Sequence, residues 1–152
     1  MSAAFLEVKL LKAEVFMSGY YRYPTVHDSK VVFVSEDDLW QVPLEGGMAS
    51  RLTSPLGTIS NPCFSPDGKW LAFSSSEEGY KEIYVMPAQG GSLKRLTYLG
   101  GQNSATGWLD NKTIVFRSDA FMPSRMTGLA TVSITGELAT PMKLGPAANM
   151  AI

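Results

Sequence analysis

The sequence contains few of the residues on which catalytic and metal centres depend. Among its 152 residues there is one cysteine and one histidine. A single cysteine excludes an intrachain disulfide and any metal cluster built on cysteines. Cys63 lies in an apolar segment, which favours a buried, unreactive thiol over a nucleophile. His27 directly precedes Asp28 in an expected turn, where local hydrogen bonding is favoured over catalysis.

Strong charge and long apolar runs are also missing. The formal net charge is −1 and the Lys and Arg residues form no cluster, so nothing electrostatic favours nucleic acid as a partner. No apolar run reaches the roughly 20 residues of a membrane helix, and Glu7, Lys9 and Lys12 interrupt the apolar core that a signal peptide would need. We therefore predict a cytoplasmic protein with no membrane partner.

Turn residues, in contrast, are plentiful: the chain has 14 glycines and 9 prolines. Between residues 61 and 97 they separate four short apolar segments that read as antiparallel strands. Pro66 presets the backbone for a type I turn, and Gly68 supplies the positive φ that follows it. Gly90-Gly91 provides another tight turn. This stretch predicts one four-stranded sheet.

The same pattern recurs along the chain. Asp28-Ser29-Lys30, Asp67-Gly68-Lys69 and Asp110-Asn111-Lys112 lie 39 and 43 residues apart, and each opens an apolar run. Arg51-Leu52-Thr53 returns 44 residues later as Arg95-Leu96-Thr97. A period of about 40–45 residues with four strands per unit is typical of β-propeller blades.

We accordingly predict an all-β fold, a partial β-propeller of three four-stranded antiparallel blades. The expected boundaries are about 23–53, 59–97 and 104–144 for the blades, with 145–152 beginning a fourth strand set. Residues 19–152 would form this partial propeller. Residues 1–18 are ambiguous, because their apolar pattern fits either an added closing strand or a partly helical leader.

Several polar and aromatic groups have a plain structural interpretation. Arg22 is the single basic residue beside Tyr20, Tyr21 and Tyr23, and without a basic cluster that would suggest a stacking platform, packing at a blade edge is favoured. The acidic run 36–38 matches no calcium-loop spacing and reads as a solvated hairpin turn, like Glu77-Glu78-Gly79 in the next repeat. We predict no catalytic, cofactor or metal-binding residues.

The loop from Ser118 to Thr127 is too apolar for full exposure. Its apolar residues are expected to pack on a neighbouring blade or on a partner; they are Phe121, Met122, Pro123 and Met126. In the same repeat Trp108 takes the place that Phe64 and Val26 occupy in the earlier repeats.

Several motifs resemble the tricorn protease family. They are FVSEDDLW (33–40), the GG and RLT pair, the SPDGK hairpin, SDAFMPSRMTGL (118–129) and KLGPAANM, so the resemblance covers residues 19–152. It implies the first half of a six-bladed, non-catalytic propeller that guides or filters peptides for a serine protease core located in later domains. The family's substrate-holding arginine pair would fall near residues 100–108, where this sequence has none.

Half a ring leaves a blade face unpaired at each end, and large apolar faces promote association. We predict a homodimer with a two-fold axis, in which the third blade of each chain meets the first blade of the other. An open stack or a strand-swapped assembly is the next alternative. The alternative function is a TolB-like propeller that acts as a protein–protein interaction module. In either case the chain alone is not expected to be an enzyme.

Overall fold

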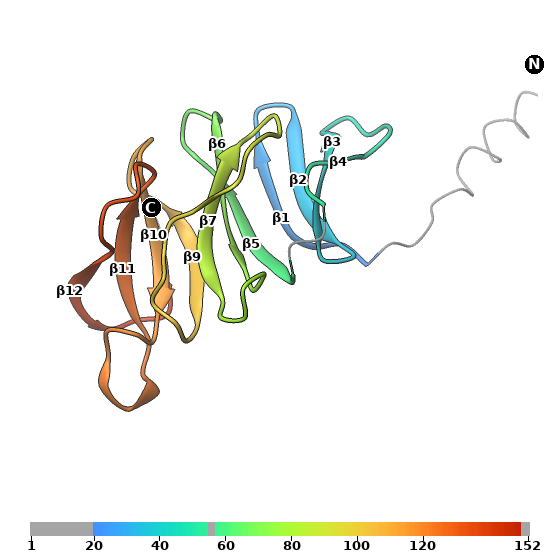
Figure 1. The fold of residues 1–152 in the computed structure, drawn as a ribbon. Coiled ribbons are helices and arrows are strands. Elements are labelled where there is room, and N and C mark those ends of the chain that lie inside the picture. Colours follow the sequence, from blue (N-terminus) through green and yellow to red (C-terminus); the bar gives the residue numbers. More distant parts are fainter. Residues whose placement is uncertain (1–19, 55–56, 150–152) are drawn as a thin grey trace, which may run out of the picture.

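The computed structural model describes residues 20–54 and 57–149, which fold into three sheets that follow one another in chain order (Figure 1). The first sheet contains β1 (Arg22–His27), β2 (Lys30–Ser35), β3 (Asp38–Pro43) and β4 (Ser50–Arg51). The second contains β5 (Ile59–Phe64), β6 (Trp70–Ser75), β7 (Glu82–Pro87) and β8 (Lys94–Arg95). The third contains β9 (Asn103–Trp108), β10 (Thr113–Ser118), β11 (Gly128–Ser133) and β12 (Thr140–Pro146). Within the described ranges, the helical segment is the short 3-10 turn η1 (Pro123–Arg125).

Each sheet is antiparallel and pairs its strands in sequence order, as a propeller blade does. The first strands β1, β5 and β9 contact one another in succession and form the inner edge of the array. The predicted all-β architecture of three four-stranded blades is confirmed. Gly145 and Pro146 lie in β12, so they complete the third blade and do not begin a fourth set. Residues 1–18 fall outside the described residues.

The turn that the sequence placed at residues 65–68 has the expected local chemistry. Gly68 has a φ of 67° and its N–H donates to the carbonyl of Ser65 at 2.8 Å. The Asp67 carboxylate accepts hydrogen bonds from the Ser65 hydroxyl at 2.6 Å and from the Lys69 N–H at 3.2 Å. These hydrogen bonds, all within the turn, stabilise the hairpin between β5 and β6.

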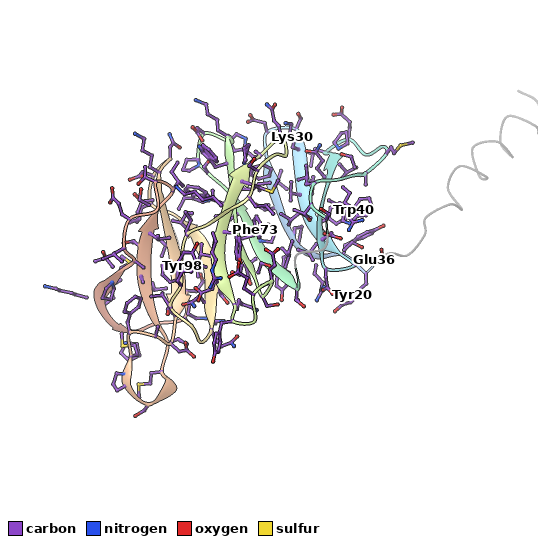
Figure 2. All side chains as sticks on the ribbon, viewed as in Figure 1. Tyr20, Lys30, Glu36, Trp40, Phe73 and Tyr98 are labelled. Atoms are coloured by element: carbon purple, nitrogen blue, oxygen red, sulfur yellow. The ribbon has the colours of Figure 1, made fainter. Side chains whose placement is uncertain are left out.

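Blades pack face to face, and the same strand positions are used each time. We call the face toward the following blade the front face and the face toward the preceding blade the back face. The front face of the first blade presents Val32, Val34 and Leu39 to the back face of the second. That back face consists of larger side chains: Leu71, Phe73, Tyr84 and Met86. Phe73 accordingly lies inside the molecule (Figure 2).

The second interface repeats this arrangement. Ala72, Ile83 and Val85 form the front face of the second blade, and they meet Ile114 and Phe116 of the third. Trp108, Ala130 and Val132 complete this cluster. At the first interface the smaller Val32 and Val34 thus meet larger side chains, whereas the back face of the third blade is itself small at Ala130 and Val132.

The two ends of the array differ. The back face of the first blade carries the equivalents of the buried Phe73 and Tyr84, namely Phe33 and Trp40, yet both are only half-buried. On the front face of the third blade, Val115 and Leu129 are already buried within this chain. The unpaired face expected at the third blade thus has these two apolar side chains covered within the chain. Unsatisfied apolar surface lies mainly on the first blade, at the end of the array where Figure 2 labels Trp40.

None of the helices among the described residues is long and apolar enough to cross a membrane.

Candidate functional site: the concave inner wall

The innermost strands of the three blades share one irregularity. A β-bulge interrupts the pairing of β1 between Arg22 and Thr25 and that of β5 between Ser60 and Cys63. Tyr23 and Asn61 occupy equivalent places in these bulges and have φ values of 52° and 54°. Residues other than glycine rarely adopt this left-handed backbone conformation, which costs them on the order of 1 kcal/mol or more. The pairing of β9 with β10 shifts near Thr106, at the corresponding height.

The bulges converge on a hollow of about 190 Å³ between the inner strands. Each blade contributes to its lining, which consists of Tyr23, Pro24, Asn61, Pro62, Cys63, Ala105 and Thr106. The lining contains no charged side chain. Bulges often lie beside functional sites, because they redirect side chains out of the regular sheet.

Hydrogen bonds between and within blades fix this wall. The Trp108 indole N–H of the third blade donates to the carbonyl of Cys63 in the second at 3.1 Å. The Thr106 hydroxyl donates to the carbonyl of Val115 at 3.0 Å. The Trp108 bond links the second and third blades along the hollow, and the Thr106 bond fixes β9 against β10 within the third blade.

Cys63 is half-buried in this wall, and its thiol lies 3.6 Å from the carbonyl of Ala72. Burial raises the pKa of the thiol to about 12, with a smaller opposing effect from hydrogen bonding to Trp108. A thiol of this kind is protonated at neutral pH and is a poor nucleophile. These features support the interpretation of Cys63 as structural.

His27 joins two blades rather than serving its own turn alone. Its Nδ1 lies 3.3 Å from the Asp28 carboxylate and its Nε2 lies 3.1 Å from the Pro66 carbonyl oxygen of the second blade. The ring also fills the space that a Cβ on Gly68 would need, 2.3 Å from Cε1. The same rim links the next pair of blades, where the Asp67 N–H donates to the Asn111 side chain at 3.0 Å. Sequence reasoning predicted the local contact and missed the contact between blades.

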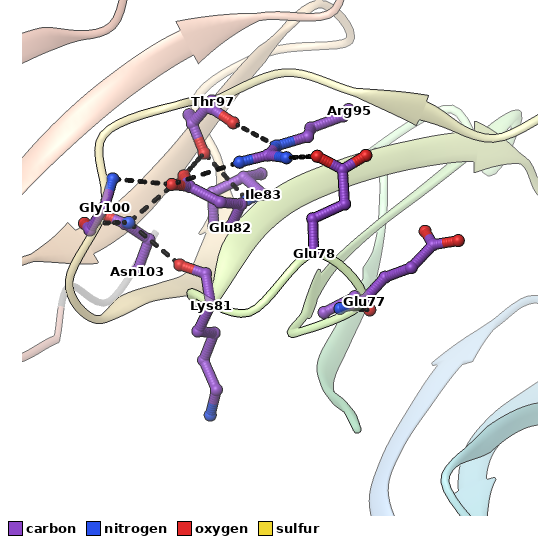
Figure 3. Close-up of polar contacts among 10 residues, drawn as sticks. Glu77, Glu78, Lys81, Glu82, Ile83, Arg95, Thr97, Gly100 and Asn103 are labelled. Carbon is purple, nitrogen blue, oxygen red and sulfur yellow. Dashed lines mark hydrogen bonds and ion pairs between the residues drawn. The ribbon is translucent and has the colours of Figure 1, made fainter. Parts of the chain in front are cut away.

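A buried acid forms a second repeated feature, which we call the acid–threonine clasp: Asp38 with Thr53 in the first blade, and Glu82 with Thr97 in the second. Figure 3 shows the pair of the second blade. In each pair the threonine hydroxyl donates to the carboxylate and accepts an N–H from the residue after the acid, at 3.0 Å in the first blade and 2.9 Å in the second. An arginine pairs with each acid, Arg51 with Asp38 and Arg95 with Glu82. The predicted solvated turn is therefore wrong for Asp38, since the carboxylate is buried by its pairing with Arg51 and Thr53.

Glu82 also ties the second blade to the third. Its carboxylate accepts the Gly100 N–H at 2.8 Å and the Asn103 side-chain amide at 3.3 Å (Figure 3). The third blade has Gly128 at the equivalent position, and Met122 fills the space beside it. Phe121 packs on the cluster between the second and third blades, whereas Met126 is exposed and so is Pro123. The expected packing of this loop thus holds for its first half.

Of the three tyrosines before and within β1, Tyr21 packs at a blade edge as expected, and the other two do not. Tyr20 is 79% exposed, and Tyr21 lies edge-on to Phe33 with ring centroids 4.9 Å apart while remaining exposed. Tyr23 lines the hollow. Among the described residues no group of three or more His, Cys, Asp or Glu side chains could hold a metal ion.

Inner strands, bulges and blade-to-blade packing define a segment of a β-propeller. The family model of the tricorn protease N-terminal beta propeller domain matches residues 18–152, and the chain belongs to this family. It is 33% identical over 135 residues to tricorn protease homolog 1 of Streptomyces coelicolor, covering 88% of this chain and 13% of that protein. It is 31% identical over 143 residues to a protein named as a tricorn-like protease N-terminal subunit of Sulfurisphaera tokodaii, covering 90% of this chain and 72% of that protein.

Solved structures agree with this assignment. The crystal structure of the tricorn protease superposes with a TM-score of 0.78 at 30% identity, over 90% of this chain and 14% of that chain. TolB from Agrobacterium tumefaciens superposes with a TM-score of 0.68 at 21% identity, over 82% of this chain and 49% of that chain, which shows a shared fold. The predicted resemblance to the tricorn family is confirmed.

Proposed function

We propose that this chain forms part of a propeller channel that guides or filters peptides for a tricorn-like protease core. The observation that carries the proposal is the uncharged concave wall to which all three inner strands contribute. Peptides of varied sequence can pass such a wall, because it offers no fixed charge to trap or repel particular side chains. The names of the relatives, proteases and a protease subunit, support the same role.

The chain's part in this role is non-catalytic. His27 is occupied by Asp28 and the Pro66 carbonyl, and Cys63 is held as a neutral thiol. A nucleophile and its base must lie within hydrogen-bonding reach of one another, and these two side chains have other partners. We expect the isolated chain to hydrolyse no peptide above background, and reproducible cleavage lost on changing one serine would contradict this.

The exposed back face of the first blade supports a proposal about assembly. Phe33 and Trp40 occupy positions that are buried between blades elsewhere in the chain, so a partner surface is expected to cover them. The proposed partner is a second copy, whose third blade meets this face. A cytoplasmic location stays a prediction.

The alternative is a TolB-like interaction module that binds a protein through loop surfaces. The similarity to TolB structures favours it at the level of fold. The downstream coding sequence discriminates between the two functions, since further blades followed by a protease core would support the peptide channel.

A chimera tests the channel function. Residues 18–152 would replace the matching segment of the Streptomyces protease, with and without Thr106→Trp, which narrows the inner wall. We expect the substitution to slow hydrolysis of long peptides while leaving dipeptide-sized substrates unchanged. Equal rates on long peptides in both chimeras would contradict the proposal.

A further inference from the structure

The two inner-strand residues with strained backbones line the same hollow. Tyr23 and Asn61 have left-handed backbones at equivalent bulges, and both line the space of about 190 Å³ between the blades. A left-handed non-glycine residue is retained only where the surrounding structure imposes it, and such residues gather at functional sites. Two of them facing one hollow indicate that the hollow itself has a use.

The polar groups in the hollow suit an amide ligand. The Asn61 side chain has an amide donor and an amide acceptor, and no hydrogen bond joins it to another described residue. Tyr23 adds an aromatic ring that is 43% exposed. An asparagine amide can pair with a backbone amide in both directions, and a flat peptide group can stack on a tyrosine ring.

The prolines limit how tightly a peptide can bind here. β1 and β5 are the innermost strands, so their free edges could otherwise accept a passing peptide as an added strand. Pro24 and Pro62 directly follow the two left-handed residues and supply no N–H for such pairing. Contact is therefore confined to the hollow, which favours brief binding over capture.

From these observations we propose that the hollow is a peptide subsite, in which Asn61 and Tyr23 bind the backbone amide of a neutral, extended peptide segment. The inference rests on the proposed channel function and specifies where the peptide touches this chain. A peptide with a charged side chain at this point finds no opposite charge in the lining and binds more weakly. Binding of the neutral segment depends little on salt.

The test is an NMR titration of the isotopically labelled full chain with acetyl-Ala-Ala-Ala-amide, and with the same peptide carrying a central Lys or Glu. The neutral peptide is expected to shift the amide signals of Tyr23, Asn61 and Thr106. Asn61→Gly keeps the left-handed backbone and removes the side-chain amide, so affinity should fall by about fivefold or more. Glu36→Gly is the matched control, because Glu36 has a φ of 49° on an exposed turn, and it should leave binding unchanged.

The outcomes separate the subsite from the channel function. Shifts confined to other surfaces, equal binding of charged and neutral peptides, or full affinity in Asn61→Gly would each overturn the subsite. If the titration fails while the chimera discriminates peptide length, the channel function stands and the subsite falls. If the titration succeeds and the chimera does not discriminate, the hollow is a peptide site without a guiding role.

Discussion

Cys63 illustrates how a single residue takes its chemistry from its neighbours. The thiol lies against the Ala72 carbonyl in the inner wall, and burial holds it in the neutral form. The thiolate is the form that attacks an alkylating reagent, and its share falls tenfold for each unit by which the pKa exceeds the pH. Cys63 should therefore react slowly with iodoacetamide at pH 8, although it is half-buried and not sealed.

The measurement is the labelling rate by mass spectrometry in buffer and in denaturant. With a pKa of about 12, the thiolate share at pH 8 is about one in ten thousand, and labelling should accelerate at least a hundredfold on unfolding. Equal rates in the two conditions would show that the thiol is free in the folded chain.

Asp67 gives a prediction about acid stability. The hydrogen bond from Ser65 is the main factor that lowers the pKa of Asp67 from its ordinary 3.8, with further lowering by Lys69. A carboxylate whose pKa falls on folding stabilises the fold above pH 3.8, and this contribution disappears as the pH falls through the lowered value. Asp67→Asn should therefore reduce stability at pH 7 and flatten the loss of stability below pH 3.8.

Denaturant unfolding between pH 7 and pH 2 would measure this effect. Asp110 has a pKa lowered mainly by the Lys112 N–H, so Asp110→Asn provides a parallel case in the third blade. The half-buried Asp119 is unsuitable as a control, because it accepts the Gln102 N–H; Glu45→Gln on the exposed turn after β3 serves instead. A pH profile for Asp67→Asn that parallels the original would refute the assignment.

At the scale of the element, the acid–threonine clasp explains why Arg-Leu-Thr recurs. Thr97 accepts the Ile83 N–H and donates to Glu82, both of which are buried. Thr97→Val keeps the shape but leaves a buried donor and a buried carboxylate short of partners. We expect it to destabilise the chain by about 2–3 kcal/mol.

Denaturant unfolding of matched variants checks this prediction. Thr53→Val makes the equivalent change in the first blade and should cost a similar amount, while Thr140→Val on the exposed β12 should cost less than about 0.5 kcal/mol. Equal effects for all three variants would mean that the clasp contributes nothing specific.

Strands and hairpins were the features that the sequence predicted best. Hairpins such as 65–68 follow from Pro66 and Gly68, which act on the backbone where they stand. The burial of Asp38 could not be predicted, because it depends on Arg51 and Thr53, which lie 13 and 15 residues further along the chain. The bulges of the candidate site were missed too, although the dipeptides Tyr23-Pro24 and Asn61-Pro62 at equivalent strand positions were a signal, since proline within a strand often marks a bulge.

At the scale of the whole molecule, the back face of the first blade is the surface most in need of a partner. Phe33 lies at the position of the buried Phe73 and Phe116 but is half-buried. If a second copy covers this face, Phe33→Glu should weaken self-association by at least tenfold, since a buried charge would replace an aromatic contact. Sedimentation velocity over a range of concentrations measures the effect.

Leu138→Glu is the control for that experiment, because Leu138 is 95% exposed on the turn before β12. This variant should self-associate as strongly as the unsubstituted chain does. Near-ultraviolet circular dichroism would show whether Phe33→Glu still folds. If the unsubstituted chain stays monomeric at every concentration, the proposed homodimer is contradicted.

Each of the three sheets in the described part of the chain is assembled from one continuous stretch of sequence. A gene divided between two blades would consequently sever no ladder of strand pairing, and the separated products would need only to restore side-chain contacts and a few links such as Lys81 with Gln102. Splitting or joining genes between blades therefore disrupts little hydrogen bonding in this architecture, and two separately encoded polypeptides could share one propeller.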